Sequence, residues 1–161
     1  MLTIRHAVTV HASAERCFDL TRSVDLHVDS SPEIGAQAVG GRQDGLSELG
    51  DETTWSARFF GVRFAMTTRI EGYTSPYHFN DRMTNGLLRR FTHVYRFEAQ
   101  PDGCCNVSDE LQVEAPFGFL GCLMERFYLI RKMETLVCLR LERIKAAAEG
   151  EEWKRYLPSK L

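Results

Sequence analysis

After residue 33 the period of the hydrophobic pattern changes from two to about 3.6, and that change limits the folds open to this chain. Between residues 33 and 114, apolar side chains recur at every second position, which is typical of strands with one buried face. Between residues 119 and 150 they recur at every third or fourth position, which predicts a helix longer than average. This helix is the one predicted element long enough to cover the apolar face of the sheet. We therefore expect an α+β fold.

The chain before residue 33 predicts one strand followed by two short helices. The strand alternates imperfectly at Ala7 and Val8, which leaves room for a β-bulge. Ser13 is a good N-cap for the first helix, and Pro32 ends the second because the residue before a proline is pushed out of the helical region. The three elements are expected at residues 2–10, 13–22 and 23–30. A weak, glycine-rich edge strand is expected next, at residues 33–41.

The first clear hairpin joins residues 51–60 to residues 62–70. A tight turn at Phe60-Gly61 would place Trp55 opposite Met66 and Ala57 opposite Phe64. The apolar faces of the two strands then coincide, which favours this register.

The second hairpin, residues 77–84 with residues 91–98, is sensitive to loop length. A two-residue turn at Asn85-Gly86 would put Asp81 and His93 on opposite faces of the sheet. A three-residue loop puts them on the same face and pairs Asp81 with Phe91. We choose the longer loop, because the shorter one would bury the polar face of the strand.

Three polar residues then fall on faces that should be buried: Asp81, His93 and Asp109. A buried carboxylate without a partner costs several kcal/mol, so we expect His93 to lie beside Asp109. The group is open to three interpretations: a structural network, a polar contact that orients a ligand, or general acid–base catalysis with His93 moving protons. The catalytic candidates are thus His93, Asp109 and Asp81.

Composition is that of a soluble globular protein. The chain has 161 residues, about the size of one domain, with 43% hydrophobic and 26% charged residues. The net charge of −2 gives no electrostatic case for nucleic acid or for an anionic membrane. The longest apolar run, residues 117–124, is too short for stable membrane insertion. We expect one domain over residues 1–161, whose tail at 151–161 either frays or docks through Trp153 and Tyr156.

Cysteine and histidine usage predicts no metal site and no cofactor. The five cysteines include no C-x-x-C spacing, which indicates reduced thiols and a cytoplasmic location. His27 lies between Asp25 and Asp29, but one histidine and two aspartates make a weak metal signal. No targeting segment is recognisable at the N-terminus. Oligomeric state, including a homodimer, is left open.

Several strings, in this order, resemble the START-like helix-grip superfamily, also called SRPBCC or birch-pollen-allergen-like. The strings are LGDETTWSARFFGVRF (49–64), SPYHFNDRMTNG (75–86), THVYRFE (92–98) and SDELQVEAPFGFLG (108–121). They are most similar to the polyketide cyclase/dehydrase and lipid-transport branch. The resemblance implies a curved seven-stranded antiparallel sheet wrapped around a long C-terminal helix, with two short helices after the first strand. Family members often have histidine where this chain has Tyr95.

The resemblance also implies a cavity between sheet and helix that binds a small hydrophobic molecule, lipid-like or polyketide-like. An alternative is a polyketide cyclase, aromatase or dehydratase, and a second is an interaction module with a partner-binding groove. The residues expected to bind the ligand are Trp55, Phe59, Phe64, Met66, Asp81, Met83, His93, Tyr95, Asp109, Leu111 and Phe127.

Overall fold

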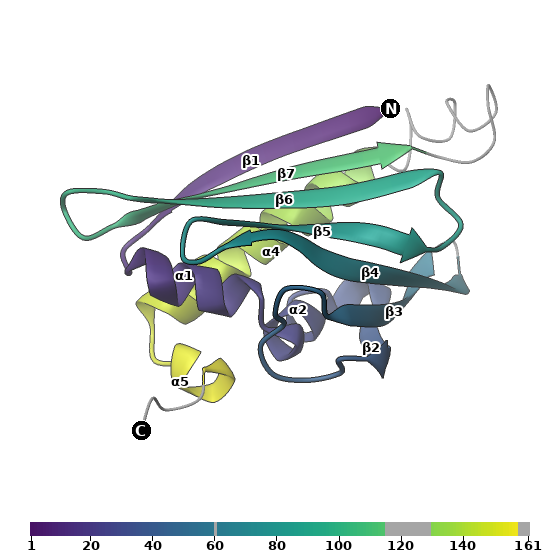
Figure 1. Ribbon diagram of the computed structural model, residues 1–161, viewed down its shortest axis with the longest axis horizontal. Helices are drawn as coiled ribbons and strands as arrows, with labels where there is room; N and C mark the ends of the chain where they lie inside the picture. Colours follow the sequence, from purple (N-terminus) through teal and green to yellow (C-terminus); the bar gives the residue numbers. More distant parts are fainter. Residues whose placement is uncertain (60, 115–129, 158–161) are drawn as a thin grey trace.

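One antiparallel sheet of seven strands forms one layer of the molecule, and the helices form the other (Figure 1). The computed structural model describes residues 1–59, 61–114 and 130–157. The strand order is β1-β7-β6-β5-β4-β3-β2. Strands β2 to β7 therefore form a meander, and β1 pairs with β7 at the edge opposite β2. The strands are β1 (Leu2–Val10), β2 (Gln37–Gly41), β3 (Glu52–Phe59), β4 (Val62–Thr74), β5 (His78–Asn85), β6 (Arg90–Ala99) and β7 (Cys105–Glu114). The helices are α1 (Ala14–Thr21), α2 (Val24–Asp29), the 3₁₀ turn η1 (Pro32–Ile34), α4 (Ile130–Glu149) and α5 (Trp153–Tyr156). The predicted α+β helix-grip architecture is confirmed.

The N-terminal strand is more regular than its sequence suggests. β1 pairs with β7 in one continuous register from Leu2 to Val10, so the expected room for a bulge is not used. The reason is that His6 takes the inward position between Ile4 and Val8, which keeps the alternation intact.

The two short helices begin where their caps predict. The Ser13 hydroxyl accepts a hydrogen bond from the Arg16 N–H, and Ser23 caps α2 in the same way. The side chains that form the predicted stripe of α1 are all buried: Ala14, Cys17, Phe18 and Thr21. Pro32 stands after α2 and opens the η1 turn.

The hairpin of β3 and β4 has the predicted register. Trp55 lies opposite Met66, and Ala57 lies opposite Phe64. β2 is the edge strand, as its glycine content predicts, and its pairing with β3 shifts between Ala38 and Gly40.

The hairpin of β5 and β6 corrects our sequence prediction. Asp81 pairs with His93 rather than with Phe91, and Phe79 pairs with Tyr95. The connection is longer than three residues, because β5 ends at Asn85 and β6 begins at Arg90. The extra length lets Leu88 fold back against the core. The predicted register is wrong by two residues. Because side chains alternate with a period of two, Asp81 and His93 still lie on the same face of the sheet, as predicted.

Helix α4 lies behind the sheet in Figure 1, with α1 beside it. Its buried side is the predicted stripe of Val137, Leu141, Ile144 and Ala148, and it ends before Gly150. The spacing of the sequence also places Leu120, Leu123 and Phe127 on this side of the helix and predicts a break or bend near residues 121–125. These positions lie outside the described residues. No helix within the described ranges has the length and apolar content needed to cross a membrane.

The closely packed part of the core lies where α1 meets the sheet. Phe18 touches the rings of Tyr73, Phe79 and Phe97 edge-on, with centroids 5.2, 5.4 and 5.3 Å away. The C-terminal segment docks here too, because the buried Tyr156 donates a hydrogen bond of 2.8 Å to Asp29.

Candidate functional site

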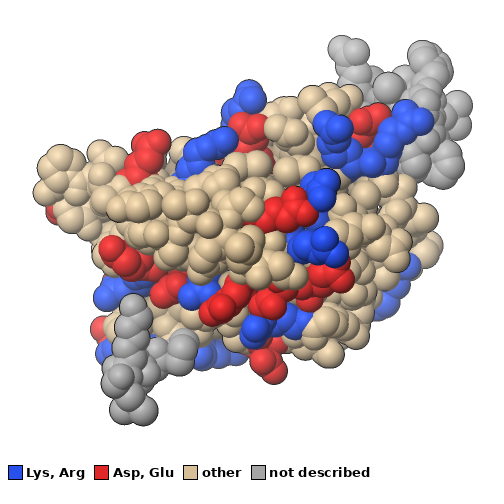
Figure 2. Space-filling view, viewed as in Figure 1, with Lys and Arg blue, Asp and Glu red and all other residues tan. Residues whose placement is uncertain are grey.

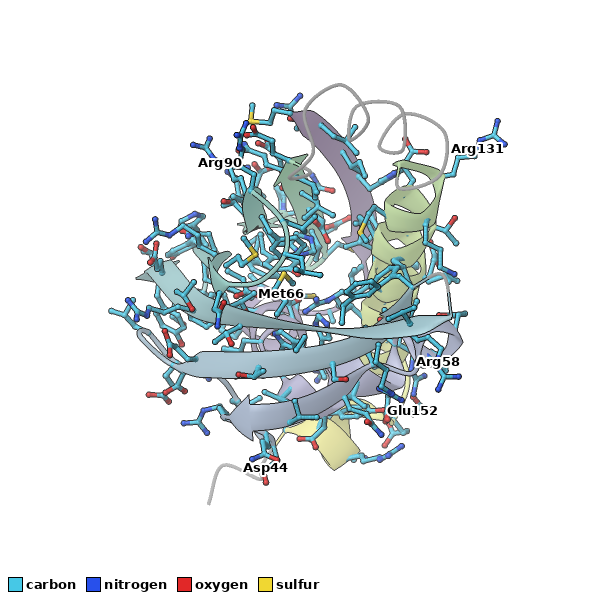
Figure 3. All side chains as sticks on the ribbon, turned by 90° about the vertical axis from the view of Figure 1, so that its right-hand side faces the viewer. Asp44, Arg58, Met66, Arg90, Arg131 and Glu152 are labelled. Carbon is cyan, nitrogen blue, oxygen red and sulfur yellow. The ribbon has the colours of Figure 1, made fainter. Side chains whose placement is uncertain are left out.

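A cavity of about 450 Å³ lies between the sheet and α4, beyond the closely packed core. Most of its wall is apolar: Ile34, Ala36, Trp55, Ala57, Phe59, Phe64, Ala65, Met66, Leu87, Leu88, Phe91, Leu111, Met133, Leu136 and Val137. A single element can contribute residues both to the packed core and to the cavity wall. On β6, Tyr95 is packed in the core whereas His93 faces the cavity. Figure 3 places Met66 near the centre of the molecule, while Arg58 and Arg131 lie toward its outside.

The structure divides the residues that we expected to bind a ligand. Those on the cavity wall are Trp55, Phe59, Phe64, Met66, Asp81, His93 and Leu111. Met83, Tyr95 and Asp109 are not among the wall residues, and Phe127 lies outside the described residues. Met83 packs near Gly86, where a Cβ would lie 2.7 Å from its sulfur. Tyr95 and Asp109 lie deeper, both 1% exposed.

A hydrogen-bonded chain runs through His93. Its Nε2 donates to Asp109 Oδ1, and its Nδ1 accepts from the Tyr95 hydroxyl at 2.8 Å. These directions are assigned from the partners: the carboxylate oxygen accepts from Nε2–H, which leaves Nδ1 to accept from the tyrosine hydroxyl. Both ring nitrogens of His93 therefore already have protein partners, although the side chain lines the cavity.

Asp81 also faces the cavity, but with fewer hydrogen-bond partners than His93 has. It is 8% exposed, and among the described residues its Oδ1 has no hydrogen-bond partner. Burial raises the pKa of Asp81, while the Thr68 hydroxyl and the charges of His93 and Arg140 oppose that rise. This carboxyl therefore keeps its proton to a higher pH than a surface aspartate does.

Four polar wall residues were missed by sequence reasoning: the titratable His27 on α2 and Arg140 on α4, and the hydroxyl residues Ser31 and Thr68. The sequence contained a signal for Arg140. It lies at helical spacing between Val137 and Ile144, so this charged residue occupies a buried position of the apolar stripe. It is 8% exposed, donates from Nη2 to the Thr21 carbonyl at 3.0 Å, and lies 5.1 Å above the Tyr95 ring.

His27 stacks on Trp55 with ring centroids 4.1 Å apart. Burial lowers the pKa of His27 well below its usual range, and the charges of Arg140 and His93 add to this. The imidazole is therefore neutral near pH 7, and no described residue hydrogen-bonds its ring nitrogens. The neighbouring Asp25 and Asp29 are engaged elsewhere, with the Gly45 N–H and with Tyr156. The described residues contain no group of three or more side chains suited to hold a metal ion.

Comparison with solved structures identifies the fold. A protein from Thermus thermophilus matches with a TM-score of 0.68 and 18% identity, over 91% of this chain and 99% of that one. The Zhui aromatase/cyclase from Streptomyces sp. R1128 matches with 0.67 and 15%, over 92% and 93%. A START superfamily protein from Mycobacterium smegmatis matches with 0.65 and 14%, over 88% and 96%. No protein-family model and no curated protein matches the chain.

These likenesses show that the chain has the START-like helix-grip fold, as the sequence resemblance implies. The fold is one that encloses space between a curved sheet and a long helix. At these identities the likeness concerns the fold alone, and the site must be argued from its own residues.

Proposed function

We propose that this protein binds one small apolar or amphipathic molecule in the cavity between the sheet and α4. The observation that carries the proposal is the cavity itself. Its volume of about 450 Å³ falls in the usual range for small-molecule sites, roughly 300–1,000 Å³, and its wall is apolar with a few convergent polar groups. Protein interiors are otherwise closely packed, and an unfilled apolar space of this size lowers stability. A bound ligand that fills this space accounts for the presence of the cavity.

A substitution that fills the cavity tests the proposal. Ala57 contributes only a methyl group to the wall, so Ala57→Phe should occupy the space that a ligand needs. We expect the neutral fluorescent probe N-phenylnaphthylamine to bind the unmodified protein at one site, and to bind Ala57→Phe about tenfold more weakly or worse, a loss of about 1.4 kcal/mol.

The matched control is Arg58→Phe, which adds the same ring at the next position of β3, where the side chain is exposed. This variant should bind the probe as the unmodified protein does. Equal probe binding by Ala57→Phe and Arg58→Phe would count against an internal site.

A second candidate function is a cyclase or aromatase acting on a polyketide-like substrate. The observation that favours it is His27, a neutral imidazole on the cavity wall whose ring nitrogens have no partner among the described residues. The sequence pointed to His93, with Asp109 and Asp81, for this chemistry. Because both ring nitrogens of His93 are engaged, we assign proton abstraction to His27 and the orientation of substrate to His93 and Asp81.

His27→Phe separates this function from simple binding, because phenylalanine keeps a ring on Trp55 but has no nitrogen to accept a proton. If the protein is a cyclase, the variant should lose turnover of a poly-β-ketone substrate by about 100-fold or more while binding N-phenylnaphthylamine normally. Normal turnover in His27→Phe would remove His27 from the reaction. The interaction-module alternative, a homodimer and the cytoplasmic location stay predictions.

A further inference from the structure

Four titratable side chains of the cavity wall come from four elements, and they lie close enough for their charges to act on one another. They are His27 of α2, Asp81 of β5, His93 of β6 and Arg140 of α4. The rest of the wall is almost entirely apolar. A ligand that fills the cavity must therefore present a polar group at this place and an apolar body elsewhere.

Arg140 sets the charge that such a polar group should carry. A guanidinium stays protonated and has five N–H donors, and among the described residues Arg140 makes one hydrogen bond, to the Thr21 carbonyl. No carboxylate of the described residues lies within the 4 Å of an ion pair with Arg140. Its nearest aromatic partner, Tyr95, contributes only a ring face 5.1 Å away. A buried cation without an anion is expensive, so an anionic group would gain most at this place.

Asp81 is compatible with an anion nearby, although it is itself an acid. Its Oδ1 is buried and has no hydrogen-bond partner among the described residues, so this oxygen is free to contact a ligand. Burial raises the pKa of Asp81, which favours the protonated form. A protonated carboxyl is a hydrogen-bond donor, and it would then face the same acceptor as Arg140. His93 is already hydrogen-bonded to Asp109 and to Tyr95, so both of its ring nitrogens are engaged.

We propose that the ligand is an amphipathic organic acid whose carboxylate binds Arg140 and Asp81, with its apolar body against Trp55, Phe64 and Met66. This inference rests on the proposed binding function and narrows it to one chemical class. A charge-assisted contact to a buried guanidinium contributes selectivity against neutral molecules of the same shape.

Three ligands of equal chain length test the inference: decanoate, methyl decanoate and decylamine. Calorimetric titration is done at a pH where decanoate is ionised and decylamine is charged. We expect the unmodified protein to bind decanoate at least about tenfold more tightly than methyl decanoate, because only the acid gains a charge-assisted hydrogen bond, and to bind decylamine most weakly.

Arg140→Met should abolish this preference by weakening decanoate about tenfold or more while leaving methyl decanoate nearly unchanged. Arg140→Lys, which keeps the charge, should retain part of the preference. Arg131→Met is the matched control, because it removes an exposed arginine from the same helix. Binding of methyl decanoate by Arg140→Met shows that the variant is folded.

Asp81→Asn keeps a hydrogen-bond donor at the head-group position in a side chain that cannot ionise. It should bind decanoate at least as tightly as the unmodified protein. A large loss in this variant would overturn the role given to Asp81. Equal binding of acid and ester by the unmodified protein, or an unchanged preference in Arg140→Met, would overturn the inference while leaving hydrophobic binding intact. Failure of decanoate, methyl decanoate and N-phenylnaphthylamine alike would overturn the proposed function as well.

Discussion

Asp81 is the residue at which burial has the clearest measurable consequence. Its carboxyl is 8% exposed and has an unpartnered oxygen, and burial raises its pKa above the usual value of 3.8. The folded protein therefore holds this proton more firmly than the unfolded chain does. By linkage, the stabilisation from protonated Asp81 is complete below pH 3.8 and is lost as the pH rises through the higher pKa of the folded state.

Asp81→Asn should remove this dependence. The free energy of unfolding of the unmodified protein, relative to that of the variant, should fall as the pH rises from 3.8 and then level off once Asp81 is ionised in both states. Urea unfolding at a series of pH values measures the difference. A difference that grows with pH would mean that the pKa of Asp81 is lowered rather than raised.

The pairing of His93 with Asp109 is the part of the polar group that the sequence predicted. Period-two alternation places both residues inward, and the cost of a lone buried carboxylate favours a partner. His27 and Arg140 were not predicted, because they come from helices far away in the chain. Their approach to β5 and β6 depends on how α2 and α4 pack, and spacing along one element carries no information about this.

At the scale of elements, the backbone conformation at the end of edge strand β2 requires a glycine at position 41. Its φ is +65°, and a Cβ there would overlap the backbone carbonyl of Glu52 on β3. Gly41→Ala should therefore lower the free energy of unfolding by about 1–3 kcal/mol, because it adds a steric overlap to a strained backbone. Urea denaturation measures the loss.

Gly45→Ala is the control for the backbone part of this loss. Gly45 has a similar φ of +68°, but nothing lies within 4 Å of a Cβ built there. Its replacement should cost only the left-handed conformation, about 1 kcal/mol. Losses of the same size at Gly41 and Gly45 would show that the contact with Glu52 has no effect.

The hairpins show what loop chemistry can and cannot predict. The β3–β4 register was predicted pair by pair, because a tight turn and two coincident apolar faces leave one solution. The predicted β5–β6 register was wrong by two residues, because the connection is longer than three residues and lets Leu88 pack against the core. The faces were still right, since a shift of two preserves the alternation.

At the scale of the whole molecule, the surface and the interior indicate different kinds of partner. On the face in Figure 2, acidic and basic side chains are intermixed, in keeping with the net charge of −2. A polyanion would find no continuous basic stripe on this face. The cavity offers a small molecule an apolar wall instead.

The cavity could be expected from the fold resemblance but not from the pattern of residues. Phe64 lines the cavity and Phe79 fills the core, yet both occupy inward positions of neighbouring strands. What separates them is Phe18 of α1, which packs on Phe79. Which half of the sheet stays unfilled is therefore decided by the placement of α1, a long-range property of the fold.

Native mass spectrometry tests the central claim most directly. The unmodified protein, Ala57→Phe and Arg58→Phe would each be incubated with an extract of small apolar and amphipathic compounds and weighed under native and denaturing conditions. We expect one small molecule per chain on the unmodified protein and on Arg58→Phe, released on denaturation, and none on Ala57→Phe. An unmodified protein that stays free of any adduct, or equal adducts on all three proteins, would contradict the account.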